Sequence, residues 1–518
     1  MAQTTPPTPG DHTLRSIKET LESLTIAFIL AFVFITFVVE AFVIPTGSMA
    51  DTLRGTHFRL LCPACGYQFN FGFNSLTYGL PEGAVPPQPV PITTARFNPA
   101  GSPICPLCGA LADPSAPRRV CNGDRILVLK FLYQFRDPQP WDVVVFKNPE
   151  RPDQNYIKRL IALPGQTVQI IDGDVYIDGQ ILRKPEHVQQ ALWIRAYDSD
   201  YQPAGASRTA LRKADVWDPP FAPEPAGAWR IDPPGRRLQF TGRDEPDLLP
   251  FSPARVRKFA QGFCAYNGQF SDDLSVASDL QLEFVLTPQA SAGAATILLG
   301  KYDRLYRADV RFDGACTISD ETPAGQITPN QYRPTPEPAG EVLDRMNVGP
   351  LAPGKPVPVS FAVVDHAWRL RVGERRLEKL GLDAPAAWGY PPKPRPSFPS
   401  VALAGQGGPF LLQQVRLSRD VYYTNQAGSQ AGRGTERNPF QLAQDEFFVC
   451  GDNSPQSHDS RFWQDPGKGN SRSYRPGVVP RDYLIGRALF VYWPSGFTLH
   501  PRFPLALVPN VGSMRFIH

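Results

Sequence analysis

Hydrophobic and polar residues follow two different patterns along this chain. Near the N-terminus, residues 23–39 include no charged side chain, and apolar residues resume after Glu40 as far as Ile44. As a helix, this stretch would rise about 33 Å, enough to cross a hydrocarbon core of ~30 Å. It lacks the polar face of a soluble helix, and its apolar region is longer than that of a cleaved signal peptide. The pattern therefore predicts a retained transmembrane helix over residues 23–44.

Beyond the N-terminus, short runs of alternating apolar and polar residues predict β-strands. Between residues 185 and 438 these runs are separated by turns rich in proline and glycine, and they include 280–286, 308–312, 357–364, 368–372 and 410–417. Such period-two strands predict a two-sheet antiparallel sandwich. The last run, GPFLLQQVRLSRDVYY, is similar to the final strand of concanavalin-like jelly rolls. The predicted fold class is mainly β, and a sandwich alone does not identify a ligand.

Length and composition agree with a protein of several domains. At 518 residues the chain is too long for one ordinary core, so two or three domains are expected. The 53 basic and 49 acidic residues leave a net charge of only +4, with no basic block or stripe. This balance argues against nucleic acid as a partner.

One polar loop concentrates residues that can carry out chemistry. It follows an apolar run and the turn residue Gly451, and residues 447–463 read FFVCGDNSPQSHDSRFW. Its hydroxyls, carboxylates and guanidinium group would have to satisfy one another if buried. A surface turn is the alternative interpretation. Three further segments favour a site instead: PTGSM at 45–49, GDRILVLK at 123–130 and YIKRLIALPG at 156–165.

A serine nucleophile needs a base within hydrogen-bond reach. Ser48 follows the predicted membrane helix and lacks the Gly-x-Ser-x-Gly elbow of the α/β-hydrolases. With seven histidines in the chain, a Ser-His-Asp triad stays open on count alone. A lysine base must be neutral, and burial in apolar surroundings lowers its pKa. Lys158 has apolar neighbours, but so do Lys130 and Lys147.

Together and in this order, the four segments resemble the type I signal peptidase family, whose members are membrane-anchored serine proteases with a serine–lysine dyad. The resemblance covers roughly residues 20–60, 121–183 and 440–497. It implies that Ser48 is the nucleophile and Lys158 the general base. Only at Lys158 does the sequence match the family's lysine box, so the resemblance decides against the other two lysines.

The same resemblance implies roles for the residues around the dyad. The Thr46 hydroxyl and the Ser48 N–H would form the oxyanion hole, and Ser457 would orient the lysine amine. Asp452, Asp459 and Arg461 would rigidify the loop through an Asp–Arg ion pair. The chain departs from the family at Ala50–Asp51, where a proline often precedes the threonine. Ser454-Pro455-Gln456 also replaces a segment that typically contains arginine, and neither departure touches the dyad.

The family resemblance also implies a substrate and a location. It implies removal of signal peptides from secretory preproteins after small residues of the Ala-x-Ala type, with no cofactor for catalysis. Preproteins and the lipid bilayer would be the partners, at the cytoplasmic (inner) membrane with a single span and an extracytoplasmic catalytic domain. The charges flanking the span are balanced and do not set this orientation. A rival hypothesis is an inactive membrane-anchored binding protein that acts through the β-sandwich.

Two cysteine pairs precede the second catalytic segment. Cys62 and Cys65 form one CxxC pair, Cys105 and Cys108 form another, and each pair is followed by glycine. Two such knuckles predict a structural zinc site with four thiolate ligands. Two disulfides are the alternative in an oxidising compartment. A pairing of Cys264 with Cys316 stays open.

These predictions divide the chain into seven segments. They are a cytoplasmic tail (1–22), a transmembrane helix (23–44), the serine part of the catalytic core (45–60), a zinc-ribbon-like insertion (61–120), the lysine part of the core (121–184), a β-sandwich insertion (185–438) and the C-terminal part of the core (439–518).

Overall fold

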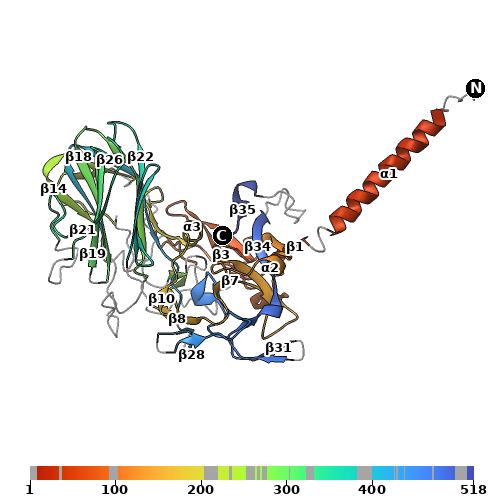
Figure 1. The fold of residues 1–518 in the computed structure, drawn as a ribbon. Coiled ribbons are helices and arrows are strands. Elements are labelled where there is room, and N and C mark those ends of the chain that lie inside the picture. The colour runs from red at the N-terminus through yellow and green to blue at the C-terminus, as the bar shows by residue number, and fades with distance from the viewer. Residues whose placement is uncertain are drawn as a thin grey trace, which may run out of the picture.

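The computed structural model confirms a mainly β protein. It describes residues 9–33, 38–92, 103–203, 220–232, 236–252, 263–264, 266, 269–270, 277–302, 304–322, 332–381, 400–424, 426–427, 430–436, 438–469, 472–495 and 510–518. Figure 1 shows helix α1 (Pro9–Val33) projecting from a β-rich body, with a second set of sheets on the opposite side of that body.

The sequence-predicted helix over residues 23–44 is wrong in its C-terminal part. Helix α1 ends at Val33, and Val39–Val43 forms strand β1. This strand pairs antiparallel with strand β5 (Arg125–Leu129), so its backbone hydrogen bonds go to the sheet and not along a helix. Among the described helices, none has both the length and the apolar character needed to cross a membrane.

An antiparallel sheet of eight strands forms the centre of the body. Its order is β1, β5, β34 (Leu484–Trp493), β6 (Val143–Lys147), β7 (Asn155–Ala162), β30 (Glu446–Cys450) and β33 (Val479–Pro480), with β35 (Arg515–Phe516) added to β34. Strand β5 therefore lies between β1, near the N-terminus, and β34, near the C-terminus. A smaller sheet, β10 (Gln180–Ile181), β9 (Asp174–Ile177), β8 (Thr167–Ile171) and β29 (Phe440–Gln441), packs nearby.

Two larger antiparallel sheets enclose a separate hydrophobic core. The first contains β11 (Ile194–Asp198), β12 (Trp229–Ile231), β13 (Arg237–Phe240), β26 (Phe410–Arg419), β17 (Leu280–Pro288), β22 (Val357–Val364), β23 (Ala367–Val372) and β24 (Arg375–Leu380). The second contains β14 (Arg243–Pro250), β25 (Ser400–Gly407), β18 (Gly293–Lys301), β19 (Arg304–Arg311), β20 (Ala315–Asp320) and β21 (Glu341–Asn347). Residues of both sheets share this core, and the alternating strands predicted from the sequence supply much of it.

A buried ionic cluster joins the sandwich to the catalytic core. Lys301 of β18 contacts Asp174 of β9 and Asp279, while Lys184 contacts Asp365 at 2.5 Å and Asp420 at 2.8 Å. The side chains of this cluster are nearly inaccessible to solvent. Breaking one buried pair would leave an uncompensated charge, so the cluster couples the two units strongly.

The cysteine-containing insertion builds a small sheet beside the serine segment. Its strands are β2 (His57–Leu61), β3 (Gln68–Gly72) and β4 (Val120–Cys121), followed in space by the short helix η2 (Ser75–Tyr78). The remaining described elements are α2 (Leu132–Phe135), α3 (Glu186–Leu192), β15 (Phe263–Cys264), β16 (Gln269–Phe270), β27 (Gln426–Ala427), β28 (Gln430–Ala431), η5 (Ser454–Gln456), β31 (Gly467–Gly469), β32 (Arg472–Tyr474), η6 (Arg481–Tyr483) and η7 (Val511–Ser513).

Candidate active site

The serine segment and the polar loop after β30 are held together by backbone contacts. The Asn453 N–H donates to the Ser48 carbonyl at 3.0 Å, and the Asn453 side-chain amide donates to the Gly47 carbonyl at 2.9 Å. A Cβ at Gly451 would lie 2.2 Å from Ser457 Oγ and 2.5 Å from the Ser48 carbonyl oxygen. Glycine is therefore required at position 451 because the two segments approach closely.

Lys158 of β7 reaches the hydroxyl of Ser48. Its Nζ lies 2.6 Å from Ser48 Oγ, across a sequence separation of 110 residues. The lysine side chain is only 4% exposed. Burial lowers the pKa of Lys158 to about 8, although the nearby carboxylates of Asp459 and Asp452 act in the opposite direction. About a tenth of the amine is therefore neutral at pH 7 and able to accept a proton, and this fraction rises with pH.

The alternative bases have other partners. Lys130 lies 3.1 Å from the Glu40 carboxylate and is more than a third exposed, and Lys147 is exposed at the end of β6. The His458 ring is 54% exposed and contacts Glu150 at 2.9 Å. Only Lys158 combines burial with a contact to Ser48, so the geometry singles it out from the candidates left open by the sequence.

Two buried arginine–carboxylate pairs fix the walls behind the lysine. Arg461 binds Asp459 in a bidentate pair at 2.8 and 2.7 Å, and the Gly451 N–H donates to Asp459 at 2.9 Å. Burial alone would raise the pKa of Asp459, but Arg461 holds that pKa below its ordinary value. Asp452 has a different partner, Arg159, with distances of 2.7 and 2.8 Å. Planar bidentate pairs of this kind are among the strongest and most rigid side-chain contacts.

From the sequence, Arg159 had no assigned role, and Asn453 was one residue of the polar loop without an assigned contact. Arg159 follows Lys158 on β7, so the two side chains point to opposite faces of the strand. The lysine meets Ser48, and the arginine meets the loop carboxylate on the other face. A buried arginine needs a carboxylate partner, but the spacing of nearly three hundred residues gives no sequence signal for this pair.

The expected role of Ser457 is not realised in this geometry. Its Oγ is buried and makes no hydrogen bond to the Lys158 amine among the described contacts, whereas it does help to lower the pKa of Asp459. Thr46 is exposed and lines the same cleft as Ser48, as the oxyanion-hole expectation requires. That cleft has a volume of about 680 Å³.

The four cysteines of the insertion converge in space. Their sulfurs lie within 4.8 Å of one another, with Cys62 Sγ 3.4 Å from Cys108 Sγ and Cys65 Sγ 3.7 Å from Cys105 Sγ. A tetrahedron of Zn–S bonds of about 2.3 Å has edges of ~3.8 Å, so these separations suit zinc. All four thiols are free, and Cys316 also carries a free buried thiol. The alternative of two disulfides is therefore not formed among these four cysteines, and the side chain of Cys264 lies outside the described residues.

Both cysteine pairs have the backbone turn expected of metal knuckles. Gly66 and Gly109 take φ values of 75° and 76°, a left-handed conformation that glycine adopts without a steric penalty. Each glycine N–H donates to the carbonyl of the first cysteine of its pair, at 3.0 and 2.9 Å. The left-handed turn after each cysteine pair thus explains why glycine follows the pair in the sequence.

A second acidic group lies in the junction between the catalytic core and the sandwich. Asp174, Asp279 and Asp365 bring carboxylate oxygens within 4.8 Å of one another. The ammonium groups of Lys301 and Lys184 contact these carboxylates directly. The lysines occupy the position of a cation, so this group is explained as an ionic junction.

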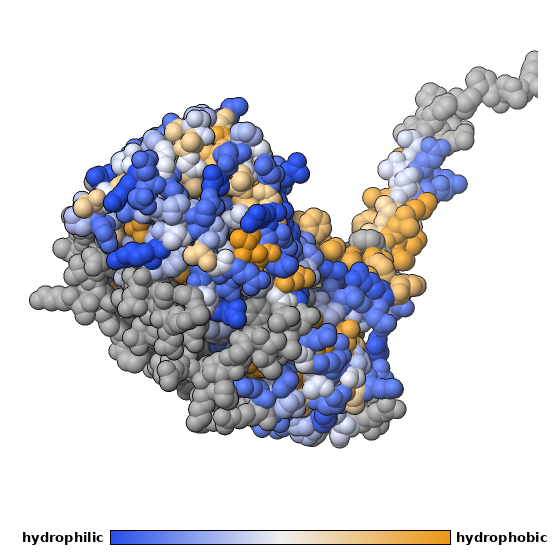
Figure 2. Space-filling model, turned by 60° about the vertical axis from the view of Figure 1, so that its left-hand side comes forward, coloured by the Kyte–Doolittle hydropathy of each residue, from blue (hydrophilic) through white to orange (hydrophobic). Residues whose placement is uncertain are grey.

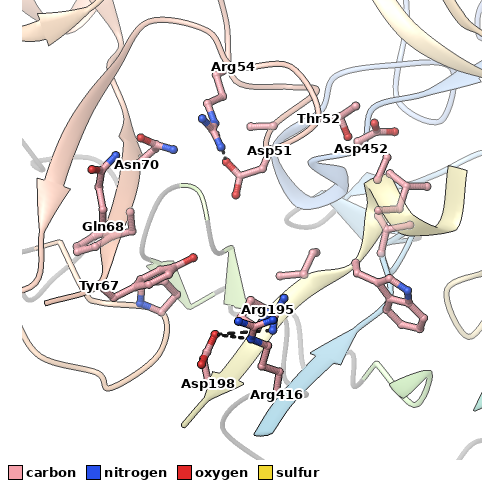
Figure 3. Close-up of a pocket in the computed structure, with 18 of the residues that line it drawn as sticks. Asp51, Thr52, Arg54, Tyr67, Gln68, Asn70, Arg195, Asp198, Arg416 and Asp452 are labelled. Carbon is pink, nitrogen blue, oxygen red and sulfur yellow. Dashed lines mark hydrogen bonds and ion pairs between the residues drawn. The ribbon is translucent and has the colours of Figure 1, made fainter. Parts of the chain in front are cut away.

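A second pocket lies on the side of the serine segment formed with the sandwich. Figure 3 shows polar side chains from several separate parts of the chain around it, and its volume is about 440 Å³. Arg416 contacts Asp198 at 3.2 Å, and Arg54 contacts Asp51 at 3.4 Å, so these charged groups are paired with each other. Without a nucleophile next to a base, this pocket is not the site of the chemistry.

Comparison with known proteins finds matches to two parts of the chain, which include Lys158 and the polar loop after β30 but not Ser48. Residues 111–213 and 408–493 match the family described as "Signal peptidase, peptidase S26". The chain is 39% identical over 109 residues to a probable signal peptidase I-1 of Synechocystis, covering 18% of this chain and 55% of that protein. It is 41% identical over 73 residues to signal peptidase I of Pseudomonas aeruginosa, covering 12% and 26%. The chain thus spans about a quarter to a half of these two relatives.

The solved structures that resemble this chain cover about a third of it. A carbohydrate-binding module CBM66 from Bacillus subtilis is 11% identical with a TM-score of 0.23, covering 37% of this chain and 91% of that one. A galectin LEC-6 from Caenorhabditis elegans is 16% identical with a TM-score of 0.18, covering 35% and 94%. Scores this low carry no functional argument.

Proposed function

We propose that this chain, whose residues 111–213 and 408–493 match the family described as "Signal peptidase, peptidase S26", is a serine endopeptidase that removes signal peptides from exported preproteins. In this proposal Ser48 attacks the scissile carbonyl, and neutral Lys158 takes the hydroxyl proton. The observation that carries the proposal is the 2.6 Å contact between Lys158 Nζ and Ser48 Oγ in a buried setting. A positioned nucleophile and base are the requirement for covalent catalysis by serine.

The proposed oxyanion hole consists of the Ser48 N–H and the Thr46 hydroxyl. The placement of Thr46 and Ser48 on the same cleft supports it. A donor of this kind stabilises the charge that develops on the substrate oxygen, and its removal typically lowers kcat by about 10²–10³-fold. The Asp452–Arg159 and Asp459–Arg461 pairs are proposed to position the lysine and the loop without taking part in proton transfer.

Among the described residues, the first part of β7 has no strand partner on one side, and this edge supports a polypeptide substrate. Residues 155–158 of β7 pair with β6 on one side, whereas β30 pairs with β7 only from Arg159 onward. Residues 154–158 line the cleft that contains Ser48. An extended peptide could add to such an edge through main-chain hydrogen bonds. We propose that the substrate binds in this way, with small Ala-like residues of an Ala-x-Ala sequence before the cut.

We also propose that the N-terminal arm holds the enzyme at a lipid bilayer, at the cytoplasmic membrane with the catalytic domain outside. Large apolar side chains between Leu24 and Val33 are 46% to 69% exposed on α1. Figure 2 shows hydrophobic residues gathered on the half of the arm nearest the body. Exposed apolar surface of this extent is typical of membrane or protein contacts. Flotation of the protein with and without residues 1–38 on liposomes tests this proposal.

For the cysteine cluster we propose one structural zinc ion per chain, bound by Cys62, Cys65, Cys105 and Cys108. The sulfur separations and the two left-handed glycines support it. Four thiolates fill the coordination shell of zinc and leave no position for a catalytic water. Zinc would therefore stabilise the insertion and supply no chemistry to Ser48.

The proposed activity is tested by incubating the detergent-solubilised protein with a preprotein whose signal peptide ends in Ala-x-Ala. We expect cleavage directly after that sequence by the wild type and none by Ser48→Ala. Mass spectrometry of the products locates the cut. If the wild type fails to cleave preproteins of several sources, the peptidase proposal fails, and the hypothesis of an inactive binding protein takes its place.

A further inference from the structure

The cysteine-containing insertion supplies one whole side of the catalytic cleft. Besides Gln154 and residues 155–158 of β7, the cleft is lined by side chains between positions 56 and 92. They are Thr56, Phe58, Phe71, Phe73, Asn74, Ser75, Leu76, Thr77, Tyr78, Glu82 and Ile92. From the sequence the insertion has only a metal-binding, structural role. In the fold, the insertion also lines the cleft in which a substrate of Ser48 would bind.

This wall has a fixed shape because its rings pack on one another. The Phe73 and Tyr78 rings are stacked with centroids 4.7 Å apart, and Phe58 meets Phe73 edge-on at 5.5 Å. The Tyr78 hydroxyl donates to the Pro91 carbonyl at 2.7 Å. Phe58, Phe71, Phe73 and Ile92 belong to the same hydrophobic core as Cys62, Cys105 and Cys108. The same side chains thus line the cleft and belong to the hydrophobic core that contains the cysteines.

The wall is also fastened to the segment that carries the nucleophile. The Thr56 hydroxyl bonds to the Pro45 carbonyl at 3.3 Å and to the Phe73 carbonyl at 3.1 Å. The Phe73 N–H donates back to the Thr56 carbonyl at 2.9 Å. Burial is the largest cause of the raised pKa of Tyr156 on β7, and the negative charge of Glu82 raises this pKa further. Ser48, β7 and the insertion therefore form one continuous groove.

Leu76 is an apolar side chain of this groove that remains largely exposed to solvent. It lies on η2 and is 65% exposed although it lines the cleft. Its backbone N–H is held by the Asn74 side chain at 3.1 Å, so its position is defined. An exposed leucine alone is ordinary. An exposed leucine on the rigid wall of a groove that also holds Ser48 is placed to bury itself against a substrate.

We propose that the cysteine-containing insertion is a specificity element of this peptidase, in which Leu76 and the neighbouring Tyr78 ring contact an apolar side chain of the substrate polypeptide at a position away from the scissile bond. The proposal rests on the proposed function, because the occupant of the groove is the chain cleaved at Ser48. The occupant is argued from the continuity of this wall with the dyad and from the apolar character of its exposed and partly exposed side chains.

The insertion offers a matched control for this inference. Leu61 lies at the end of β2 in the same insertion and is 67% exposed, and it does not line the cleft. The experiment compares Leu76→Asp, Leu61→Asp and the conservative Leu76→Met in the full-length, detergent-solubilised protein. The substrates are fluorogenic peptides with an Ala-x-Ala site, in which a single leucine is moved through the flanking positions.

We expect the wild type to show a lower KM when leucine occupies one particular flanking position, by about tenfold, the scale of one apolar contact in a binding pocket. Leu76→Asp should lose this preference with kcat changed less than twofold. Leu61→Asp and Leu76→Met should keep it. A leucine preference that survives in Leu76→Asp, or no preference at any position, overturns the inference.

A binding measurement separates this inference from the proposed activity. In a Ser48→Ala background, fluorescence anisotropy of the same peptides should show the leucine preference in Kd, and adding Leu76→Asp should remove it. If the wild type cleaves nothing but this binding pattern appears, the peptidase proposal fails and the assignment of the wall stands. If cleavage occurs but binding is insensitive to Leu76→Asp, the wall assignment fails and the peptidase proposal stands.

Discussion

Replacing Lys158 by methionine should abolish cleavage and, at neutral pH, stabilise the protein. The lysine is 4% exposed, and burial lowers its pKa from 10.5 to about 8. At pH values below both pKa values this difference corresponds to about 3 kcal/mol of lost folding free energy, at ~1.4 kcal/mol per pKa unit. Methionine fills a similar space without a charge, but it loses the hydrogen bond to Ser48, worth about 1 kcal/mol. The net expectation is a gain of about 2 kcal/mol.

The sign of the pH dependence distinguishes this explanation from ordinary repacking. A lysine whose folded pKa is lowered destabilises the fold fully below pH 8, and its penalty fades as the pH rises from 8 to 10.5. The advantage of Lys158→Met over the wild type should therefore be largest at pH 7 and disappear near pH 10.5. Groups that titrate equally in both proteins cancel in this comparison.

Differential scanning calorimetry at several pH values measures the effect. A gain of about 2 kcal/mol corresponds to roughly 4–8 °C in Tm for a cooperative unit of 150–250 residues. Lys130→Met is the control, because Lys130 is partly exposed and paired with Glu40. That surface change should alter stability by less than about 0.5 kcal/mol and leave cleavage intact. A Lys158→Met protein that is less stable at pH 7, or no more stable there than at pH 10.5, refutes the buried-amine reasoning.

Three further outcomes follow from the same structure. In the wild type, kcat/KM should rise about tenfold per pH unit up to a pKa of about 8 and then level off, because Lys158 must be neutral to accept the Ser48 proton; a flat pH profile would argue against a lysine base. Asp452→Asn should destabilise the protein by about 3–5 kcal/mol, because it leaves Arg159 buried without its carboxylate. Denaturant unfolding measures this loss, and a change below about 1 kcal/mol would contradict that pairing. Elemental analysis should find about one zinc per chain in the wild type and none in Cys62→Ser. Zinc removal should raise KM more than it lowers kcat, because the cysteine core packs behind the side chains that line the cleft. An immediate loss of kcat in a folded protein would mean that zinc acts in the chemistry.

The candidate dyad could be predicted from the sequence, but only through the family resemblance. Apolar neighbours left three lysines as possible bases, because a strand pattern does not say which side chain meets a serine 110 residues away. The structure separates them by burial and contact: Lys158 meets Ser48, while Lys130 meets Glu40. The expected hydrogen bond between Ser457 and the Lys158 amine is not among the contacts of the described residues.

The cysteine pairs show how far local sequence can go. The CxxC spacing and the following glycines determined two knuckles, because each is set by a few consecutive residues and by the backbone freedom of Gly66 and Gly109. The side of the insertion that faces the catalytic cleft depended on how β2 and η2 pack beside Pro45. No local pattern records such packing.

What the sequence determined by itself was the mainly β class, the segments that carry the chemistry and the composition of each one. These are properties of residues close together in the chain, where alternation, turn residues and motif spacing act directly. Only the tertiary structure decided that Val39–Val43 is a strand, although its apolar residues continue the pattern of the preceding helix. It pairs with β5, about ninety residues further along, and the hydrogen bonds of that edge outweigh a local apolar pattern that helix and strand could share.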